Sequence, residues 1–214
     1  MGLTATSKGG DFELPPIGVA VGRCYRVIDL GTQDTTFKGK PKRQHKVLLT
    51  WELLGEKRMN DGRPYSINSR YTMSTGTLSQ LRRDLESWRG VPFTAEEIAA
   101  FKVAKVLGKY CLLNIVHEQN GEKTYANIAA IMPVPKGMPK PEGVNEDIIF
   151  DLDDRDMRIF EKFSDSLKTT IMASAEWAPT THSKQNADGF NDDIPWPDKD
   201  ESAPKEETHF EPPF

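Results

Sequence analysis

The amino-acid sequence predicts an all-β fold with helices: a five-stranded barrel with a helix between strands three and four, an extra C-terminal helix and a disordered acidic tail. Three observations predict it. Apolar and polar residues alternate in several segments, one segment changes to helical spacing, and the charge reverses late in the chain. We therefore divide the chain into a flexible N-terminal arm at 1–16, a barrel domain at 17–137, a linker and amphipathic helix at 138–177 and a disordered acidic interaction tail at 178–214.

The first two strands follow from residue type and alternation. Residues 18–30 are rich in valine and isoleucine, which favours a strand, whereas the Gly, Thr, Pro and Lys of residues 31–43 predict a loop. Residues 44–54 alternate His, Val, Leu, Trp and Leu on one face with Lys, Leu, Thr and Glu on the other. This pattern predicts a half-buried second strand with Trp51 on its core side.

A turn at 60–64 precedes a third strand at 65–73, after which the period changes. Leucines and a tryptophan recur at helical spacing over 78–88, and Gly90 follows them as a stop signal. This segment predicts an amphipathic helix. A capping box at residues 94–97 predicts a second, short helix.

Strand character returns at 109–118, an Asn120-Gly121 turn reverses the chain, and 124–131 forms the returning strand. Three strands, a helix and a hairpin is the order of the OB-fold, a small closed barrel. A five-stranded SH3-like barrel lacks the long helix, and a sandwich ordinarily has more strands. Residues 151–172 carry an apolar stripe behind several aspartates, which predicts the extra helix; it packs on the barrel or forms a dimer seam.

Cysteine and histidine usage argues against metal and redox chemistry. Cys24 and Cys111 lie in apolar runs and are expected to be buried thiols in a reducing compartment. No histidine pairs with a cysteine at metal-ligand spacing, and no Gly-rich phosphate loop follows a strand. The acidic run at 151–156 departs from a calcium loop because Arg155 occupies a ligand position. We therefore expect no enzyme activity, no cofactor and no metal.

Charge is distributed asymmetrically along the chain. Residues 1–140 hold 21 Lys+Arg and 13 Asp+Glu, a net charge of +8, whereas residues 141–214 hold 7 and 19, a net charge of −12. We expect this asymmetry if residues 1–140 bind the phosphates of a nucleic acid and residues 141–214 do not bind them. No apolar run is long enough to span a bilayer and the N-terminus lacks a secretory signal, so we expect a cytoplasmic protein without a membrane partner.

An OB barrel binds single strands across strands two and three and the flanking loops, with cations on the phosphates and flat rings on the bases. The candidate nucleic-acid-binding residues at those places are Phe37, Lys38, Lys40, Lys42, Arg43, Lys46, Arg63, Tyr65, Arg70, Tyr71, Lys123 and Tyr125. Tyr65 and Tyr71 share a face with apolar residues, so each is either a stacking platform or part of the core. Tyr25 and Tyr110 are left undecided between the same two roles.

The tail carries an independent signal. Residues 191–196 read Asn-Asp-Asp-Ile-Pro-Trp, which resembles the Asp-Asp-Ile-Pro-Phe ending of bacterial single-stranded DNA-binding proteins that other replication and repair proteins recognise. Here the run is internal, and the free carboxylate belongs to a separate Pro-Pro-Phe ending. The resemblance implies a partner-binding tail made of Asp192, Asp193, Ile194, Pro195, Trp196, Phe210, Pro213 and Phe214.

Several runs of the barrel region also resemble one known family. They are Lys46–Leu53, Tyr71–Ser74, Leu81–Gly90, Gly108–Leu112 and Gly121–Ala126. Together they resemble bacteriophage and prophage OB-fold proteins proposed to bind single-stranded DNA, over residues 18–137. The resemblance covers a little more than half of the chain.

The resemblance implies a sequence-nonspecific single-stranded DNA-binding protein that protects strand intermediates in phage DNA replication or recombination in the bacterial host cytoplasm. Its acidic tail would recruit replication or recombination proteins, and self-association into a homo-oligomer is left open. The alternative is a protein-interaction module or host-factor inhibitor that uses the acidic tail as a DNA mimic. A metal-dependent nuclease is a third reading, and RNA in place of DNA stays open.

Overall fold

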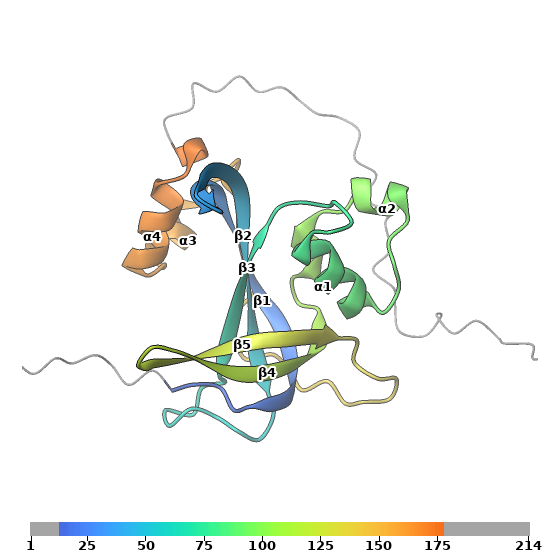
Figure 1. Cartoon of the computed structure of the whole chain (residues 1–214). Helices are drawn as coiled ribbons and strands as arrows, with labels where there is room; N and C mark the ends of the chain where they lie inside the picture. The colour runs from blue at the N-terminus through green and yellow to red at the C-terminus, as the bar shows by residue number, and fades with distance from the viewer. Residues whose placement is uncertain (1–12, 178–214) are drawn as a thin grey trace, which may run out of the picture.

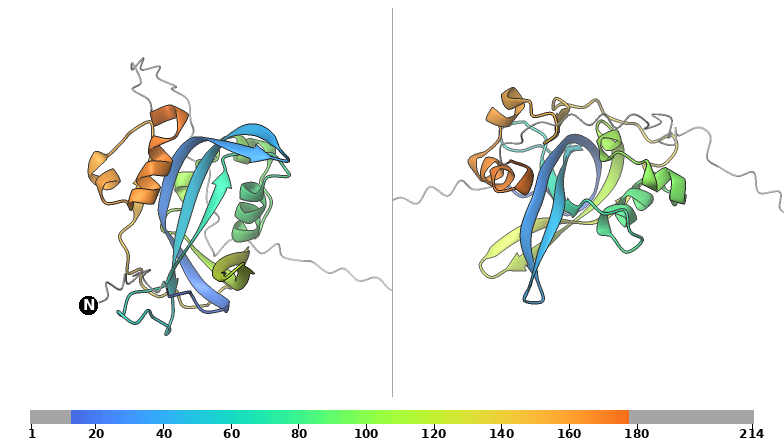
Figure 2. Two further views of the ribbon diagram at one scale, coloured as in Figure 1. Left: turned by 60° about the vertical axis from the view of Figure 1, so that its left-hand side comes forward. Right: turned by 90° about the horizontal axis from the view of Figure 1, so that it is seen from above.

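The computed structural model describes residues 13–177, in which a strongly curved β-sheet has helices on both sides (Figures 1 and 2). Its strands are β1 (Gly18–Phe37), β2 (Lys40–Leu54), β3 (Ser66–Thr72), β4 (Tyr110–Asn120), β5 (Lys123–Met132) and β6 (Ile148–Phe150). The order β3-β2-β1-β4-β5 is antiparallel throughout, and β6 adds to β1 in parallel. An all-β fold with helices is therefore confirmed, whereas the predicted count of five strands is wrong because β6 is a sixth.

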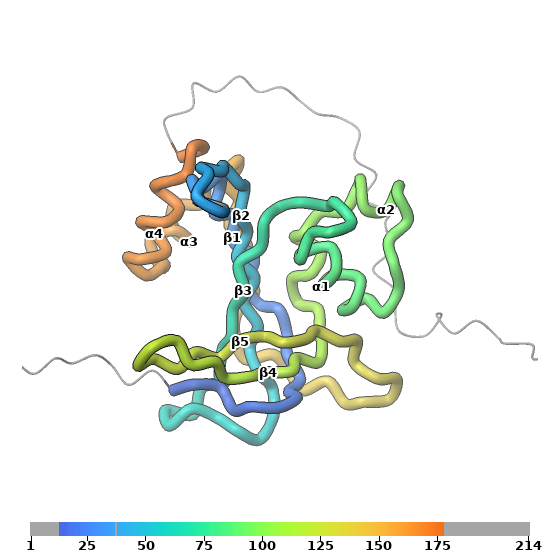
Figure 3. The backbone as a smooth tube through the Cα atoms, viewed as in Figure 1, coloured from blue at the N-terminus to red at the C-terminus, as the bar shows by residue number. Residues whose placement is uncertain are grey.

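The helices fall into two groups on opposite sides of the sheet (Figure 1). They are α1 (Gln80–Arg89), α2 (Ala95–Ala99) and the 3₁₀ turn η1 (Val103–Val106) between β3 and β4, and α3 (Met157–Glu161), α4 (Asp165–Met172) and the 3₁₀ turn η2 (Ala175–Trp177) after β6. Figure 3 follows the backbone from β5 through the long connection to this last group. We call residues 148–177 the C-terminal module. The predicted helix between strands three and four is confirmed as α1.

The β1–β2 hairpin is longer than predicted. Residues 31–43 form paired strands, not a loop, and the ladder runs out to Phe37 opposite Lys40. Only Lys38 and Gly39 form the turn, with φ of 50° and 75°, the positive pair that a tight two-residue hairpin requires. The loop prediction is wrong because the outer part of this hairpin, residues 34–43, pairs through its backbone while most of its side chains are exposed, so it shows no apolar alternation.

One core lies between the inner face of the sheet and α1. Leu49, Trp51 and Leu53 point to this face, and Trp51 is fully buried with its ring centroid 5.8 Å from that of Trp88. Ser79 caps α1 at its N-terminus, and Gly90 ends it in the left-handed conformation. The prediction that Trp51 faces the core is confirmed.

A second core covers the opposite, outer face of β1 and β2. Ile28, Leu30 and Leu48 are buried there against the aromatic and aliphatic side chains of the C-terminal module, Phe150, Leu152, Phe160, Phe163, Leu167 and Ile171. The prediction of a half-buried strand is wrong for this reason, because residues 47–54 are buried on both faces.

The predicted single helix over 151–172 is also wrong, because two short helices, α3 and α4, occupy 157–161 and 165–172 of that range. Asp156 caps the first, and an extended Ser164 begins the second. Between them Phe163 turns inward and packs edge-on against Phe150, with ring centroids 5.4 Å apart. A straight helix would hold only one stripe against the sheet, so the break lets more aromatic rings reach the outer core.

A buried ion pair fastens the connection that leads into the C-terminal module. Glu52 on the outer face of β2 is fully buried, and Arg23 of β1 donates to it at 2.5 Å. The backbone N–H of Val144 (3.2 Å) and of Asn145 (2.9 Å) also donate to Glu52. Arg23 reaches on to Asp147 at 2.5 Å. Both oxygens of the buried Glu52 carboxylate accept hydrogen bonds from this segment. Residues 143–147 therefore lie over one end of the outer face.

Gly31 lets the C-terminal module approach the backbone of β1. Its φ is +67°, and an added Cβ would stand 2.5 Å from Ser174 Cβ and 2.7 Å from Leu152 Cδ1. Beside it Glu176 accepts hydrogen bonds from Thr32 N (2.6 Å) and Thr32 Oγ1 (2.5 Å). The module is thus held by close packing and by a carboxylate at the same point.

We expect Gly31→Ala to lower the free energy of unfolding by about 2–4 kcal/mol, because overpacking and a left-handed backbone both oppose the new methyl group. Gly39→Ala is the matched control, since Gly39 has φ +75° and nothing within 4 Å of its added Cβ; it should cost only about 1–2 kcal/mol. Urea denaturation measures both values. Equal losses in the two variants would show that the module does not press on Gly31.

The short helix α2 is held by a carboxylate with two kinds of donor. Glu97 completes the predicted capping box with Thr94, which is confirmed. Arg89 also donates to both Glu97 oxygens, at 3.0 and 2.5 Å. These contacts, Arg89 first and the Thr94 amide second, lower the pKa of Glu97 to about 2.

Glu97→Gln should therefore lower the free energy of unfolding by about 2 kcal/mol at neutral pH, because Arg89 loses its charged partner. The folded pKa of about 2 lies below the ordinary 4.5. The difference between wild type and variant is thus fully present above about pH 5 and disappears as the pH falls toward 2. Urea denaturation across this pH range measures it. A difference that stays constant down to the lower limit would contradict the assignment.

Candidate nucleic-acid interface

The outer side of the β1–β2 hairpin and of β3 carries a line of cations, which we call the cationic track. Lys40, Lys42 and Lys46 alternate along one side of β2, and the register places Arg70 of β3 directly opposite Leu48 on that side. Lys40, Lys42 and Arg70 are exposed, and Lys46 is half-buried. From Lys40 to the level of Leu48 the track spans eight strand residues, about 26 Å.

Three of the four cations of the track, Lys40, Lys46 and Arg70, have no acidic partner in the described part of the chain. Lys46 Nζ donates to two neutral oxygens, Gln44 Oε1 (2.9 Å) and Thr72 Oγ1 (2.8 Å). Burial, and after it the neighbouring Lys42 charge, lower the pKa of Lys46. Within residues 13–177, Lys40, Lys46 and Arg70 make no ion pair. These three cations can therefore accept anions without first breaking salt bridges.

Two other predicted cations are already paired. Arg43 lies 3.3 Å from Asp34, and both are well exposed. Arg63 lies 2.6 Å from Asp61, and this contact lowers the pKa of Asp61. Arg63 also sits in the β2–β3 connection, at the end of β2 far from the hairpin tip, so the structure does not bring it to the track. Lys38 is exposed in the hairpin turn.

The predicted residues of the last hairpin lie on the same side of the molecule as the β1–β2 tip. Seen from above, both hairpins project from one side of the body (Figure 2, right). Lys123 and Tyr125 stand on β5 beside the β4–β5 turn, and Tyr125 is 47 % exposed. Phe37 ends β1 at the other hairpin, but its side chain lies outside the described part of the structure, as do all the tail residues from 178 onward.

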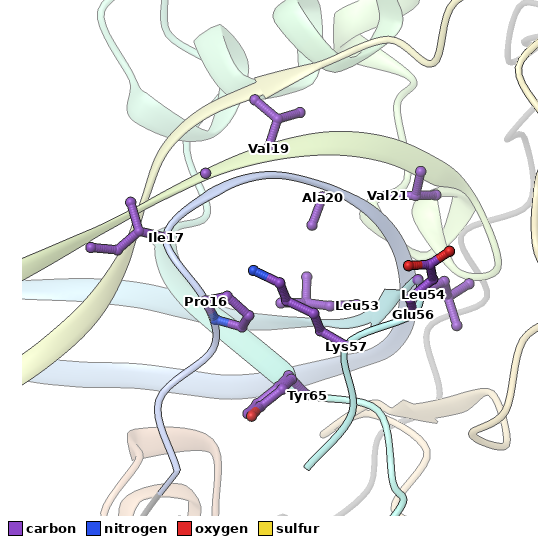
Figure 4. Close-up of a pocket in the computed structure, with 12 residues that line it drawn as sticks. Pro16, Ile17, Val19, Ala20, Val21, Leu53, Leu54, Glu56, Lys57 and Tyr65 are labelled. Carbon is purple, nitrogen blue, oxygen red and sulfur yellow. The ribbon is translucent and has the colours of Figure 1, made fainter.

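Neither of the two tyrosines left open between platform and core lies on the track. Tyr71 is 2 % exposed in the inner core, and its hydroxyl donates to Asp84 at 2.9 Å. Tyr65 is half-buried and lines a cavity of about 380 Å³ under the arch of β1 (Figure 4). Val19 and Leu53 share this lining, and Lys57 is its only cation among the described residues. The cavity is largely apolar and lies away from the hairpin tip.

The two undecided tyrosines have structural contacts. Tyr110 donates its hydroxyl to the carbonyl oxygen of Pro141 (2.9 Å), which ties the long connection to β4. Tyr25 is 7 % exposed, and its hydroxyl lies 3.3 Å from Ser66 Oγ on the outer face. Neither ring is free to stack along the track.

Two polar residues that the sequence did not single out lie on the outer face beside the track. The register places Arg26 of β1, Thr50 of β2 and Asn68 of β3 in one row across the sheet. The alternation of side chains along β3 could have predicted Asn68 as a site residue, because it lies two residues from Arg70 and therefore on the same face. Arg26 could not be found in that way, because β1 is irregular between Cys24 and Arg26, which shifts the parity of its side chains.

Residues 13–177 were also compared with the requirements of metal, membrane and thiol sites. These residues contain no group of three or more His, Cys, Asp or Glu side chains placed to hold a metal ion. Their helices are too short or too polar to span a membrane. Burial raises the pKa of the Cys24 thiol to about 12, so this cysteine stays protonated. No protein-family model matches the chain, and no curated protein matches it.

We expect Tyr71→Phe to lower the free energy of unfolding by about 1–2 kcal/mol, because Asp84 loses a donor in a partly buried place. Burial already raises the pKa of Asp84. Tyr125→Phe, which removes an exposed hydroxyl, is the control and should change stability by less than about 0.5 kcal/mol. Chemical denaturation compares the two, and equal effects would contradict the assignment of Tyr71 to the core.

Proposed function

We propose that this protein is a sequence-nonspecific single-stranded DNA-binding protein. The observation that carries the proposal is the cationic track, whose Lys40, Lys46 and Arg70 have no acidic partner among the described residues. A row of cations along a strand is suited to a polyanion that follows the strand direction. Neutral or compact ligands would leave most of these charges unused.

The architecture supports an OB-fold as the scaffold. Three strands, a helix and a hairpin occur in the OB-fold order, and β3 and β5 are the two ends of the strand path. In a closed barrel these two ends would meet. The outer side of β2 and β3 and the two projecting hairpins are the places where OB-folds bind single strands.

In the proposed mechanism, cations bind the phosphates along the strand, and few bases stack on aromatic rings. Lys40, Lys42, Lys46 and Arg70 would contact successive phosphates, and the exposed Tyr125 ring would stack on a base from the second hairpin. A track of about 26 Å fits the range of about 4–16 nucleotides that one OB-fold covers. None of these contacts reads a base edge, so the binding would be nonspecific in sequence.

The biological setting we propose is phage DNA replication or recombination in a bacterial cytoplasm, on the strength of the family resemblance. The tail at 178–214 holds nine acidic and three basic residues. It would recruit replication or recombination proteins and would compete weakly with DNA for the basic track. Its Asp-Asp-Ile-Pro-Trp run is the segment we propose as the recognition element.

We expect the full-length protein to bind a fluorescent oligo(dT) in anisotropy titrations, with affinity that falls steeply as salt rises from about 50 to 200 mM. Lys40→Gln with Lys46→Gln should lower the slope of log affinity against log salt by about 1.4, because two phosphate contacts are lost. The control Arg63→Gln with Arg158→Gln removes the same charge from two exposed arginines that are already paired with Asp61 and Asp156.

The control variant should keep the wild-type slope. If the wild type does not bind the oligonucleotide at low salt, the proposed function is overturned. If both double variants lose the same slope, binding depends on net charge alone and the track is not the interface.

A further inference from the structure

Arg26 of β1 is half-buried, and its side chain has no hydrogen bond or ion pair within the described residues. Its guanidinium lies over the ring of the adjacent Tyr25, 5.5 Å from the centroid. Its Nε is buried and makes no hydrogen bond. Within residues 13–177 no carboxylate pairs with its side chain. A buried N–H that lacks an acceptor is costly, and such groups are uncommon in folded proteins.

The row that holds Arg26 lies between two covered parts of the outer face. On one side residues 143–147 lie over Glu52. On the other side the C-terminal module covers Ile28 and Leu48. The floor of the row is Thr50, which is only 5 % exposed. Asn68 and Arg70 on β3 form its open side, where the cationic track ends.

The acidic groups near this row are already occupied. Glu52 accepts from Arg23 and from two backbone amides. Asp147 is held by Arg23 at 2.5 Å. Neither can neutralise Arg26 without giving up a contact of its own. The row therefore presents a positive charge with unused donors, next to the unpaired Arg70.

We propose that Arg26 is the anchor that selects single strands, by binding one phosphodiester in this row. The inference rests on the proposed function and assigns a role to a residue that the track alone does not require. A guanidinium offers paired N–H donors that match two phosphate oxygens. Arg70 and Asn68 would bind the next phosphate or the sugar at the open side.

We attribute the preference for single strands over duplexes to the half-buried position of Arg26. The exposed cations at the hairpin tip can contact the phosphates of any nucleic acid, single or double. Arg26 is reached only between the two covers, where a flexible single strand can bend its backbone inward. A duplex holds the phosphates of both strands in a stiff, fixed array, so it cannot adjust one backbone to a half-buried guanidinium as a free single strand can.

The test compares Arg26→Gln with Lys40→Gln in the full-length protein. Both variants lose one positive charge, but Lys40 is exposed at the hairpin tip. Each is titrated by anisotropy with oligo(dT) and with a duplex of the same length. Arg26→Gln should weaken single-strand binding about tenfold, the effect of one charge-assisted contact, and duplex binding less than about twofold. Lys40→Gln should weaken both by a similar factor.

Arg26→Lys, which keeps the charge but not the paired donors, is the second variant and covers the case in which glutamine disturbs the fold. It should lose most of the single-strand affinity, with an unchanged thermal unfolding midpoint. Equal losses on single and double strands, or no loss in either Arg26 variant, would overturn the inference and leave the proposed function standing. A wild type that binds neither ligand would instead overturn the proposed function.

Discussion

The burial of β2 on both of its faces is the constraint on which the rest of the structure depends. Trp51 and its neighbours fill the inner core against α1, while Leu48 lies in the outer core under the C-terminal module. A one-residue shift of β2 would exchange these two sets of side chains, so it would disrupt both cores at once. The register of β3 follows from that of β2, and it places Arg70 and Asn68 on the outer face.

The same cover decides which charges remain available to a ligand. Glu52 lies fully buried among the Arg23 guanidinium and backbone amides, and Glu176 is held by Thr32. Within the described residues neither carboxylate forms an ion pair with Lys40, Lys46 or Arg70. The proposed interface is thus the part of the sheet that the described chain does not cover itself, and three of its cations have no acidic partner there.

Local patterns in the sequence predicted the elements whose signals are local. Trp51 on the core side of its strand, α1 with its glycine stop and the Thr94–Glu97 capping box all rest on spacing within a few residues. The candidate site was predicted less completely. Lys40, Lys46 and Arg70 do share one surface, but Arg63 is remote, Tyr71 is in the core, and Arg26 was missed because an irregularity in β1 shifts its parity.

The sequence by itself determined the β-rich class, the order of strands and α1, and the separation of a basic front from an acidic tail, because periodicity and charge are properties of neighbouring residues. Only the tertiary structure decided that residues 31–43 pair as strands, that residues 151–172 divide into two helices, and that the module covers the outer face. Those outcomes depend on Gly31 meeting Ser174 and on Phe163 meeting Phe150. Contacts between residues so far apart in the chain leave no periodic trace in the sequence, since each partner alone is compatible with several environments.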